Sequence, residues 1–227
     1  MKILVLGKGK TGGLVAEVAQ ERGHEVSALS GSDNPNASAL TKQRLAGIDV
    51  VIDFTNPSAV VANIEACTRV GKKMVVGTTG WDAKLSEVRK LVEEKGTGFL
   101  YGSNFSVGVN VFFGVAKAAA AAMPLGYGAK IVERHHAHKK DAPSGTAASL
   151  QKIMTEASGT QPEITSIREG ETVGTHVILL DSENDIMMLV HDAKSRRGFA
   201  EGAVRGAEWI AGKRGFFEFK DIFRELP

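Results

Sequence analysis

The sequence predicts an α/β protein with a doubly wound parallel sheet, followed by a second, α+β domain with a mixed or antiparallel sheet. Strand-like and helix-like segments alternate over the first 105 residues, as in parallel sheets whose strands are connected by helices. A glycine-rich turn follows the first strand directly. Beyond residue 163, three strand-like runs follow one another without a helix between them, which indicates a separate sheet.

The first strand and the turn after it predict a dinucleotide-binding domain. Lys2–Leu6 (KILVL) is an apolar run typical of a buried strand, and the next six residues (GKGKTG) have the G-x-G-x-x-G spacing before an amphipathic helix. Glycines here allow a tight turn and a close approach to a pyrophosphate, whose charge the helix N-terminus stabilises. A Rossmann domain is therefore expected, with cofactor contacts from Gly7, Lys8, Gly9, Lys10, Thr11 and Gly12.

The end of the second strand, Glu25–Leu29, bears on the choice of cofactor. Sites that prefer NAD carry Asp or Glu there to bind the ribose hydroxyls, whereas an arginine accommodates the 2′-phosphate of NADP. This chain has residues 30–32 (SGS) at that place, with Asp33 slightly beyond, and the lysines of the first loop could supply a positive charge. Ser30 is expected to contact the cofactor, and both NADH and NADPH stay open.

The remaining elements of the first domain place further loops at the same edge of the sheet. Strands are expected at 50–54, 73–76 and 99–101, a short helix or loop at 38–45, and helices at 57–70 and 82–95. Loops at the carboxyl ends of parallel strands form the ligand site of such a sheet. Those loops are 7–12, 55–56, 77–80 and 102–105.

After Phe105 the pattern changes to that of a second domain, expected at residues 106–195. A long alanine-rich helix at 107–123 is followed by a short strand at 129–132, a helix at about 146–157 and strands at 164–168, 173–181 and 186–191. A helix at 199–212 and a strand or turn at 216–223 are expected to return to the first domain, which then comprises 1–105 and 196–227.

Two strands of the second domain are apolar at successive positions, so both faces of its sheet need cover. These runs are Val177–Leu180 and Ile186–Val190. The two helices of the domain can cover one face. The other face is expected to pack against a partner subunit.

A cluster of proton carriers indicates where the chemistry lies. Residues 133–147 read ERHHAHKKDAPSGTA, and His135, His136 and His138 are three of the six histidines of the chain. Lys139 follows them directly. Because histidine titrates near neutral pH and lysine is a proton donor and a point charge, the cluster predicts movement of a proton.

The end of the same window predicts an anion site. Ser144, Gly145 and Thr146 offer hydroxyls and backbone N–H groups at the start of a helix. Such a helix start is suited to bind a carboxylate or a phosphate. An anionic substrate is therefore expected beside the proton carriers.

Two other interpretations of residues 133–147 compete with a catalytic role. One is a solvated basic loop with a helix cap. The other is a metal site, but the three histidines lie too close along an extended chain to face one ion together, and the single cysteine, Cys67, is distant. No metal is expected.

The composition excludes several classes of protein. The 227 residues, 43% of them hydrophobic, suffice for one large domain or two small ones. A net charge of +2 argues against a nucleic-acid binder, and one cysteine fits a reducing, cytoplasmic setting. No signal peptide is expected at the N-terminus, and no apolar run is expected to reach the ~20 residues of a membrane helix.

The motifs occur together, in the same order, in one known family. The window HHAHKKDAPSGTA resembles the signature of the dihydrodipicolinate reductases, also called 4-hydroxy-tetrahydrodipicolinate reductases. GKGKTG at Gly7, GTTG at Gly77, GSNFSVG at Gly102 and EGAVRGAEWIAGK near the C-terminus also look like features of that family. The resemblance covers the whole chain.

This resemblance implies an activity and a set of site residues. The activity is the NADH- or NADPH-dependent reduction of a cyclic dicarboxylate in the diaminopimelate route of lysine biosynthesis, by a homotetramer. His135 and Lys139 match the catalytic residues, and His136, Gly145 and Thr146 match substrate contacts, beside Ser144 of the expected anion site. The remaining cofactor contacts that it implies are Gly77, Thr78, Thr79, Gly102, Ser103, Asn104 and Phe105.

The chain also departs from the family pattern. Its first loop is one residue shorter than in many members, and Ser30-Gly31 stands where an acidic and a basic residue are often found. Two alternative functions keep the same fold: a dinucleotide sensor without catalysis, and a related reductase of another imino or keto acid. The pairing of His135 and Lys139 with the 144–146 turn favours the reductase, because a sensor does not need these groups.

Overall fold

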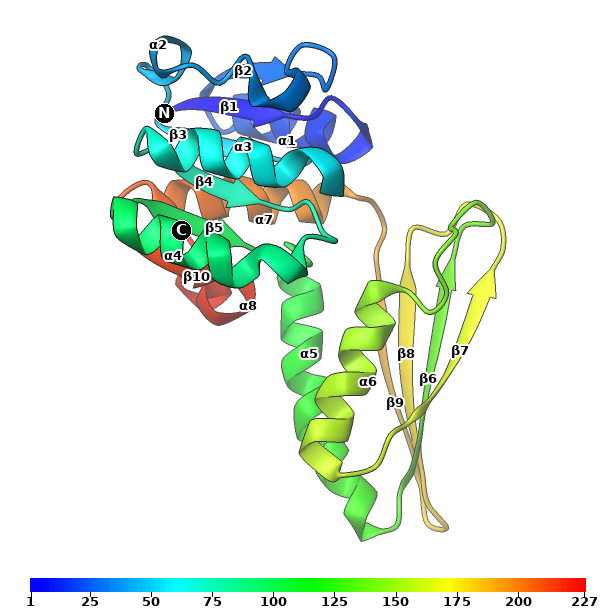
Figure 1. Ribbon diagram of the computed structural model, residues 1–227. Coiled ribbons are helices and arrows are strands. Elements are labelled where there is room, and N and C mark those ends of the chain that lie inside the picture. The colour runs from blue at the N-terminus through cyan, green and yellow to red at the C-terminus, as the bar shows by residue number, and fades with distance from the viewer. The chain divides into compact units, whose positions relative to one another are not determined.

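The computed structural model describes all 227 residues, which form two compact units. Unit 1 comprises Met1–Ser106 and Arg197–Pro227, and unit 2 comprises Val107–Arg196. Unit 1 is therefore made from both ends of the chain, whereas unit 2 is one continuous segment (Figure 1).

Unit 1 is built on a parallel sheet of six strands, so the predicted doubly wound fold is confirmed. The strand order is β10-β5-β4-β3-β1-β2, and every neighbouring pair is parallel. From β1 the chain builds outward to β2 and then returns to the other side of β1 with β3, which places the switch point between β1 and β3. The strands are β1 (Lys2–Leu6), β2 (Glu25–Leu29), β3 (Val50–Asp53), β4 (Lys73–Val76), β5 (Gly98–Tyr101) and β10 (Gly215–Glu218).

Helices cover both faces of this sheet because its strands are apolar on both faces. Ile3 and Val5 of β1 point into a core that includes Val15 and Ala203, from α1 (Lys10–Glu21) and α7 (Arg197–Ile210). Leu4 and Leu6 point the other way, toward α3 (Pro57–Arg69) and α4 (Leu85–Lys95), as Figure 1 shows. Two short helices, α2 (Lys42–Leu45) and α8 (Phe219–Ile222), complete the unit.

Unit 2 has a mixed sheet of four strands in the order β7-β6-β8-β9, which confirms the predicted second sheet. The pair β6/β7 is parallel, and the pairs β6/β8 and β8/β9 are antiparallel. One face packs on α5 (Val107–Ala119) and α6 (Gly145–Ser158) around buried residues such as Ile131, Leu150 and Ile178. The strands are β6 (Gly128–His135), β7 (Glu163–Arg168), β8 (Thr175–Asp181) and β9 (Ile186–Asp192).

Some elements differ from the expected ones at their ends. Strand β6 was expected at 129–132 but continues to His135, because β7 and β8 supply partners on both of its sides. The expected helix at 107–123 is α-helical only to Ala119 and then forms a 3₁₀ segment, Ala120–Leu125, that contains Pro124. The terminal strand or turn is a strand, β10, followed by α8.

The expectation about apolar runs was wrong in one place. The helical stretch Val107–Leu125 is long and apolar enough to cross a membrane by length and composition alone. In unit 2, however, Phe112, Ala116 and Met123 of this stretch are buried in the core against the sheet and α6. Core helices of folded proteins pass the same test, so the stretch is weak evidence for a membrane span.

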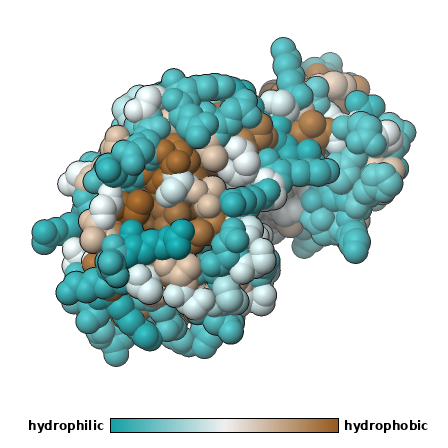
Figure 2. All heavy atoms as spheres, turned by 90° about the horizontal axis from the view of Figure 1, so that it is seen from above, coloured by the Kyte–Doolittle hydropathy of each residue, from teal (hydrophilic) through white to brown (hydrophobic).

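The exterior follows the usual division between polar and apolar side chains. Figure 2 shows that hydrophilic residues cover most of the visible face, and that apolar residues are exposed in patches between them. The most exposed large apolar side chains are Leu125 on the 3₁₀ segment and Ile186, Met188 and Val190 on β9. Large apolar side chains grouped on one strand differ from the scattered ones of an ordinary surface and indicate a contact surface.

Candidate active site

Unit 1 has a candidate cofactor site, a cavity at the carboxyl ends of β1, β3 and β4. Its volume is about 380 Å³, and it is lined by residues 9–12, 54–57 and 77–79. These residues belong to the loops that directly follow the three strands. The sequence placed the dinucleotide at this edge, and Gly9, Lys10, Thr11, Gly12, Gly77, Thr78 and Thr79 of the expected contacts line the cavity.

The glycines of the first loop give the cavity its shape. Gly7 has a φ of +98°, and a Cβ on it would lie 2.2 Å from the carbonyl oxygen of Phe54. A Cβ on Gly12 would lie 2.0 Å from the carbonyl oxygen of Gly7. Gly9 has no such neighbour within 4 Å, so its backbone is open on the side where a ligand can approach. The loop fits a pyrophosphate lying against bare backbone at the start of α1.

A buried carboxylate, that of Asp53 at the end of β3, ties two of these loops together. It accepts hydrogen bonds from the N–H (2.9 Å) and Oγ1 (2.7 Å) of Thr55, from Oγ1 of Thr78 (2.8 Å) and from Nδ2 of Asn63 (2.8 Å). Burial raises the pKa of Asp53, and the hydrogen bonds oppose that rise. Asp53 is not among the residues predicted from the sequence, although an acidic residue that ends an apolar strand is a usable signal.

The loop after β2 is organised by Asp33. Its carboxylate accepts hydrogen bonds from the N–H (2.9 Å) and Oγ (2.7 Å) of Ser30, and Lys8 Nζ lies 3.4 Å away. The hydrogen bonds from Ser30 and the Lys8 ammonium lower the pKa of Asp33 to about 2. An acidic group thus stands four residues after the end of β2, with a lysine beside it.

The other expected cofactor residues lie outside the cavity lining. Gly102, Ser103 and Asn104 follow β5. Phe105 is buried and packs on Phe219, with ring centroids 4.6 Å apart. A packing role for Phe105 in the core of unit 1 is therefore evident, and a cofactor contact from it stays a prediction.

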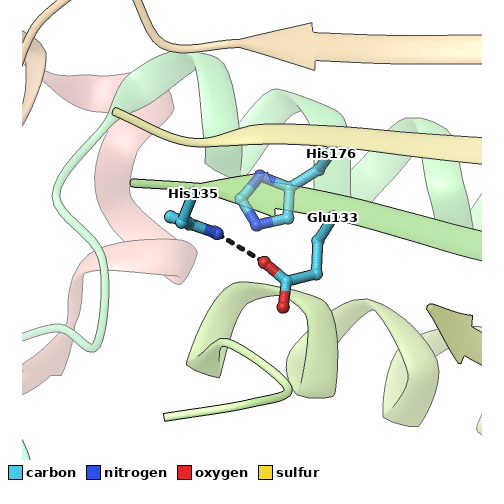
Figure 3. A group of neighbouring side chains, drawn as sticks. All are labelled: Glu133, His135 and His176. Carbon is cyan, nitrogen blue, oxygen red and sulfur yellow. Dashed lines mark hydrogen bonds and ion pairs between the residues drawn. The ribbon is translucent and has the colours of Figure 1, made fainter. Parts of the chain in front are cut away.

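Unit 2 has a candidate site of its own, where β6 ends. Glu133 and His135 are two positions apart on β6, so both side chains point to the same face of the sheet. Glu133 is fully buried and His135 is 8% exposed. Figure 3 shows the two side chains converging on each other, with the ring of His176 from β8 beside them.

The carboxylate of Glu133 is surrounded by donors. Arg168, from the end of β7, donates from Nη1 to Oε2 (2.9 Å) and from Nη2 to Oε1 (2.6 Å). The N–H of Ser144 donates to Oε1 at 3.3 Å, and Nδ1 of His135 is hydrogen-bonded to Oε2. Burial by itself would raise the pKa of Glu133, but the donors, Arg168 foremost, outweigh it and lower the pKa to about 2.

Burial favours the uncharged form of the two histidines of this cluster, His135 and His176. Their ring centroids are 5.2 Å apart in an edge-to-face arrangement. Burial lowers the pKa of His135, while the Glu133 carboxylate acts in the opposite direction. Burial lowers the pKa of His176 to about 4. Both rings are therefore uncharged near neutral pH.

The loop after β6 carries the remaining expected proton carriers. It is anchored by the N–H of His136 on the carbonyl of Thr172 (2.8 Å) and by the N–H of Lys139 on the carbonyl of His136 (3.1 Å). Lys139 Nζ donates to both oxygens of Asp141, at 2.8 and 2.9 Å. His138 and Lys140 are exposed, in keeping with solvated side chains.

The expected anion site is the N-terminus of α6, which starts at Gly145. Ser144 is the N-cap, and its Oγ accepts a hydrogen bond from the N–H of Ala147 (3.2 Å) and pairs with Nε2 of His176 (3.2 Å). Ser144 is only 2% exposed. Its side chain therefore shapes the helix end, and the groups that can face an anion belong to the first turn of α6, at Gly145 and Thr146.

Glu133, His135 and His176 could also be considered as ligands of a metal ion. One ligand atom from each lies within 4.8 Å of the others. Both oxygens of Glu133, however, are already hydrogen-bonded to the guanidinium of Arg168. A fixed positive charge at that distance opposes the binding of a cation.

Sequence reasoning named one member of this cluster and missed three. Glu133 lies inside the window of residues 133–147, yet no role is predicted for it there, and neither His176 nor Arg168 is among the predicted site residues. The alternation of Glu133 and His135 along a strand was a usable signal, because a buried acid needs a basic partner. The partner itself lies 35 residues away and comes into register only through the pairing of His135 with Arg168 across β6 and β7.

Comparison with known proteins places the chain in a family. The model of the N-terminal part of dihydrodipicolinate reductase matches residues 1–105, and the model of the C-terminal part matches residues 108–223. A 4-hydroxy-tetrahydrodipicolinate reductase from Christiangramia forsetii is 36% identical over 240 aligned positions, which cover 100% of this chain and 99% of that protein. The enzyme of the same name from Ralstonia nicotianae is 38% identical over 200 positions, which cover 78% and 75% of the two chains.

A solved structure agrees with this placement at the level of the fold. Dihydrodipicolinate reductase from Paenisporosarcina sp. TG-14, solved with dipicolinate bound, superposes with a TM-score of 0.78 at 24% identity. The superposition covers 98% of this chain and 99% of that one. Two family models that together span nearly the whole sequence, and relatives matched over most of their length, lead to one conclusion. The chain belongs to the dihydrodipicolinate reductase family.

Proposed function

We propose that this chain reduces 4-hydroxy-tetrahydrodipicolinate to tetrahydrodipicolinate with NADH or NADPH, in the diaminopimelate route of lysine biosynthesis. One observation carries the proposal: His135 and the residue that caps α6 are hydrogen-bonded to the same carboxylate, that of Glu133. A proton carrier is thereby fixed beside a helix end that can bind an anion. The names of the relatives and the dipicolinate bound by the Paenisporosarcina enzyme support a cyclic dicarboxylate as the substrate.

The substrate is held by the first turn of α6. One carboxylate of the substrate accepts hydrogen bonds from backbone N–H groups at Gly145 and Thr146, and the helix dipole adds to its stabilisation. His136, which is half-buried and belongs to the same segment of residues 133–147, supplies a further donor. Ser144 contributes by capping the helix rather than through a free hydroxyl.

The proton that the reduction requires comes from the pair His135 and Lys139. Lys139 is a proton donor by residue type, and two hydrogen bonds from its Nζ to Asp141 orient it. His135 is buried and neutral, so it exchanges a proton at its free ring nitrogen. Both residues belong to the segment that anchors on 169–172, which gives them a fixed backbone.

The cofactor site is the cavity of unit 1, whose residues fit a dinucleotide. Gly9–Gly12 with the start of α1 would hold the pyrophosphate, and Thr55 and Thr78, braced by Asp53, flank it. Bound NADH or NADPH supplies the hydride. Asp33 suits the ribose hydroxyls of NADH, and Lys8 suits the 2′-phosphate of NADPH.

An absorbance assay tests this function. The purified chain is mixed with the unstable product of the condensation of aspartate semialdehyde with pyruvate, and the loss of NADH or of NADPH absorbance is followed in parallel. Oxidation of at least one cofactor, inhibited competitively by pyridine-2,6-dicarboxylate, is expected. If neither cofactor is oxidised, the proposed reaction is ruled out. The ratio of the KM values for NADH and NADPH measures the cofactor preference, to which Asp33 and Lys8 contribute in opposite directions.

A homotetramer formed through the sheet of unit 2 completes the proposal. On the sheet face away from α5 and α6, Ile186, Met188 and Val190 are 65%, 62% and 55% exposed. Their neighbours Val177 and Leu179 on β8 are paired with Val190 and Met188 and so lie on the same face. An open apolar sheet face of this kind is a protein–protein contact surface.

Light scattering at micromolar concentration should therefore give about four times the 24.1 kDa chain mass. Val190→Asp places a charge on the apolar face and is expected to lower this mass. Thr160→Asp, in the exposed loop after α6, adds the same charge elsewhere and should leave it unchanged. A monomeric wild-type protein would contradict the assembly.

The proposed location is the cytoplasm. Cys67 is buried and unpaired, and burial raises the pKa of its thiol to about 12, so the chain neither forms a disulfide nor exposes a reactive thiolate. This suits a reducing compartment. Recovery of the native protein in the membrane fraction of cells would count against it.

A further inference from the structure

The ionised state of Glu133 is fixed by its surroundings. The carboxylate is completely buried, and both of its oxygens are hydrogen-bonded to Arg168, at 2.9 and 2.6 Å. A buried carboxylate next to a guanidinium stays charged, because neutralising it would leave the guanidinium without its partner. The pKa of Glu133 at about 2 agrees with this.

An ionised carboxylate can only accept hydrogen bonds, and this determines which nitrogen of His135 carries the proton. Nδ1 of His135 is bonded to Oε2 of Glu133, so Nδ1 must be the protonated nitrogen. In the neutral ring Nε2 then has a free lone pair. Gly174 makes room for this edge of the ring: a Cβ on Gly174 would lie 2.9 Å from Nε2.

We propose that Glu133, clamped by Arg168, is a positioning residue that holds His135 in the Nδ1–H form and so makes Nε2 the atom that takes up and releases a proton. The proposal rests on the reductase function given above. It assigns no contact with substrate to Glu133, which acts through the ring of His135.

The same clamp reaches the second proton carrier. Arg168 Nη2, which bonds to Glu133, also donates to the backbone carbonyl of Asp141 at 2.7 Å. The side chain of Asp141 in turn holds Lys139 Nζ. The guanidinium of Arg168 therefore has two effects. It fixes the orientation of His135 through Glu133, and it fixes the loop that carries Lys139 through Asp141.

A purely structural ion pair would not control the tautomer of a neighbouring ring, so the tautomer is the quantity to measure. In wild-type protein, ¹⁵N chemical shifts of the imidazole nitrogens, assigned with His135→Gln, should show His135 protonated at Nδ1 near neutral pH. In Glu133→Gln the side-chain amide can donate to Nδ1 as well as accept from it, so the Nε2–H form is expected to gain population. Glu133→Asp keeps the charge and should keep the Nδ1–H form.

Kinetics provide the second measurement. Glu133→Gln is expected to lower kcat by roughly 10–100-fold, the usual cost of removing a partner that orients a working histidine, while KM for the cofactor stays unchanged. Glu133→Asp should recover part of this loss. His135 is faced by Glu133 and Arg168, by His176 from β8 and by Lys139 from the loop, with His191 of β9 behind His176. Glu133 is the one negative charge in this group and raises the pKa of His135. Its removal in Glu133→Gln should therefore lower that pKa and move the limb of the pH profile that reports His135 to lower pH.

Glu169→Gln is the matched control. Glu169 forms an ion pair with Arg134 at 3.3 Å between the same two chain segments, but on the exposed side. This variant should keep the tautomer, kcat and pH profile of the wild type. Thermal unfolding followed by circular dichroism verifies that each variant is folded before comparison.

The outcomes separate this inference from the proposed function. If Glu133→Gln folds and its His135 stays fully Nδ1-protonated with unchanged kcat, the inference is wrong even though the enzyme is active. If Glu133→Gln does not fold, the tautomer of His135 is measured in Glu133→Asp and Arg168→Lys instead. Loss of the Nδ1–H form in Glu133→Asp, which conserves the charge, overturns the inference. If the wild type oxidises neither cofactor, the reductase proposal fails while the NMR comparison still decides whether Glu133 sets the tautomer.

Discussion

Replacing Lys139 by alanine is expected to lower kcat by about 10²–10⁴-fold, the usual contribution of a general acid. The side chain of Lys139, in the loop after β6, is 22% exposed, and two hydrogen bonds to Asp141 orient its ammonium. With His135 it forms the proposed proton-carrying pair, so its loss removes one of the two groups that can donate the proton. KM for the cofactor should change little, because the cofactor cavity belongs to unit 1.

Lys140→Ala provides the control for this prediction. Lys140 follows directly in the sequence and carries the same charge, but its side chain is exposed. Steady-state assays of both variants with saturating cofactor separate a specific role from a general effect of positive charge on an anionic substrate. Turnover of Lys139→Ala close to that of Lys140→Ala would remove Lys139 from the mechanism.

The second large effect is expected at Gly12 of α1, where alanine should lower the stability of the protein, whereas alanine at the adjacent Gly13 should raise it. A Cβ at Gly12 would lie 2.0 Å from the carbonyl oxygen of Gly7, and neither backbone segment can yield without distorting the cofactor loop. Gly12→Ala is therefore expected to cost about 3 kcal/mol, and to lower Tm by roughly 6–12 °C in a chain of this length. The measurement is thermal unfolding of the protein without cofactor.

Gly13→Ala serves as the matched variant. A Cβ at Gly13 meets no heavy atom within 4 Å, and the residue lies inside the helix. Alanine there should stabilise the helix by about 0.5–1 kcal/mol, because glycine loses more backbone freedom on folding. Equal loss of stability in both variants would show that the crowding at Gly12 is not what limits substitution.

The fold could be predicted from the sequence because its signals are local. KILVL followed by GKGKTG specifies a strand, a tight turn and a helix within a few residues, and the structure has β1 and α1 there. The change to successive strands after residue 163 likewise predicted a second sheet, which the structure confirms as β7, β8 and β9 beside β6.

The site was only partly predictable because its decisive contacts are not local. His135 and Lys139 stand out in the sequence, but the carboxylate that holds His135 is buried through pairing with Arg168, 35 residues later. The role of Ser144 also depends on distance in the chain, since its hydroxyl pairs with His176 of β8, 32 residues on. Periodicity reports the face on which a side chain lies, whereas the partner it meets there depends on the register between strands.

The division of unit 1 between both ends of the chain affects how the protein is made. A ribosome releases Val107–Arg196 as one continuous piece, which can bury Ile131 and Ile178 against its own helices while translation continues. The parallel sheet that starts at β1 has no such independence, since Ala203 and Phe219, which belong to the same core cluster as Leu100, are synthesised only after unit 2. Until then β5 keeps an unpaired edge, and a nascent chain in that state is most open to aggregation and most in need of a chaperone.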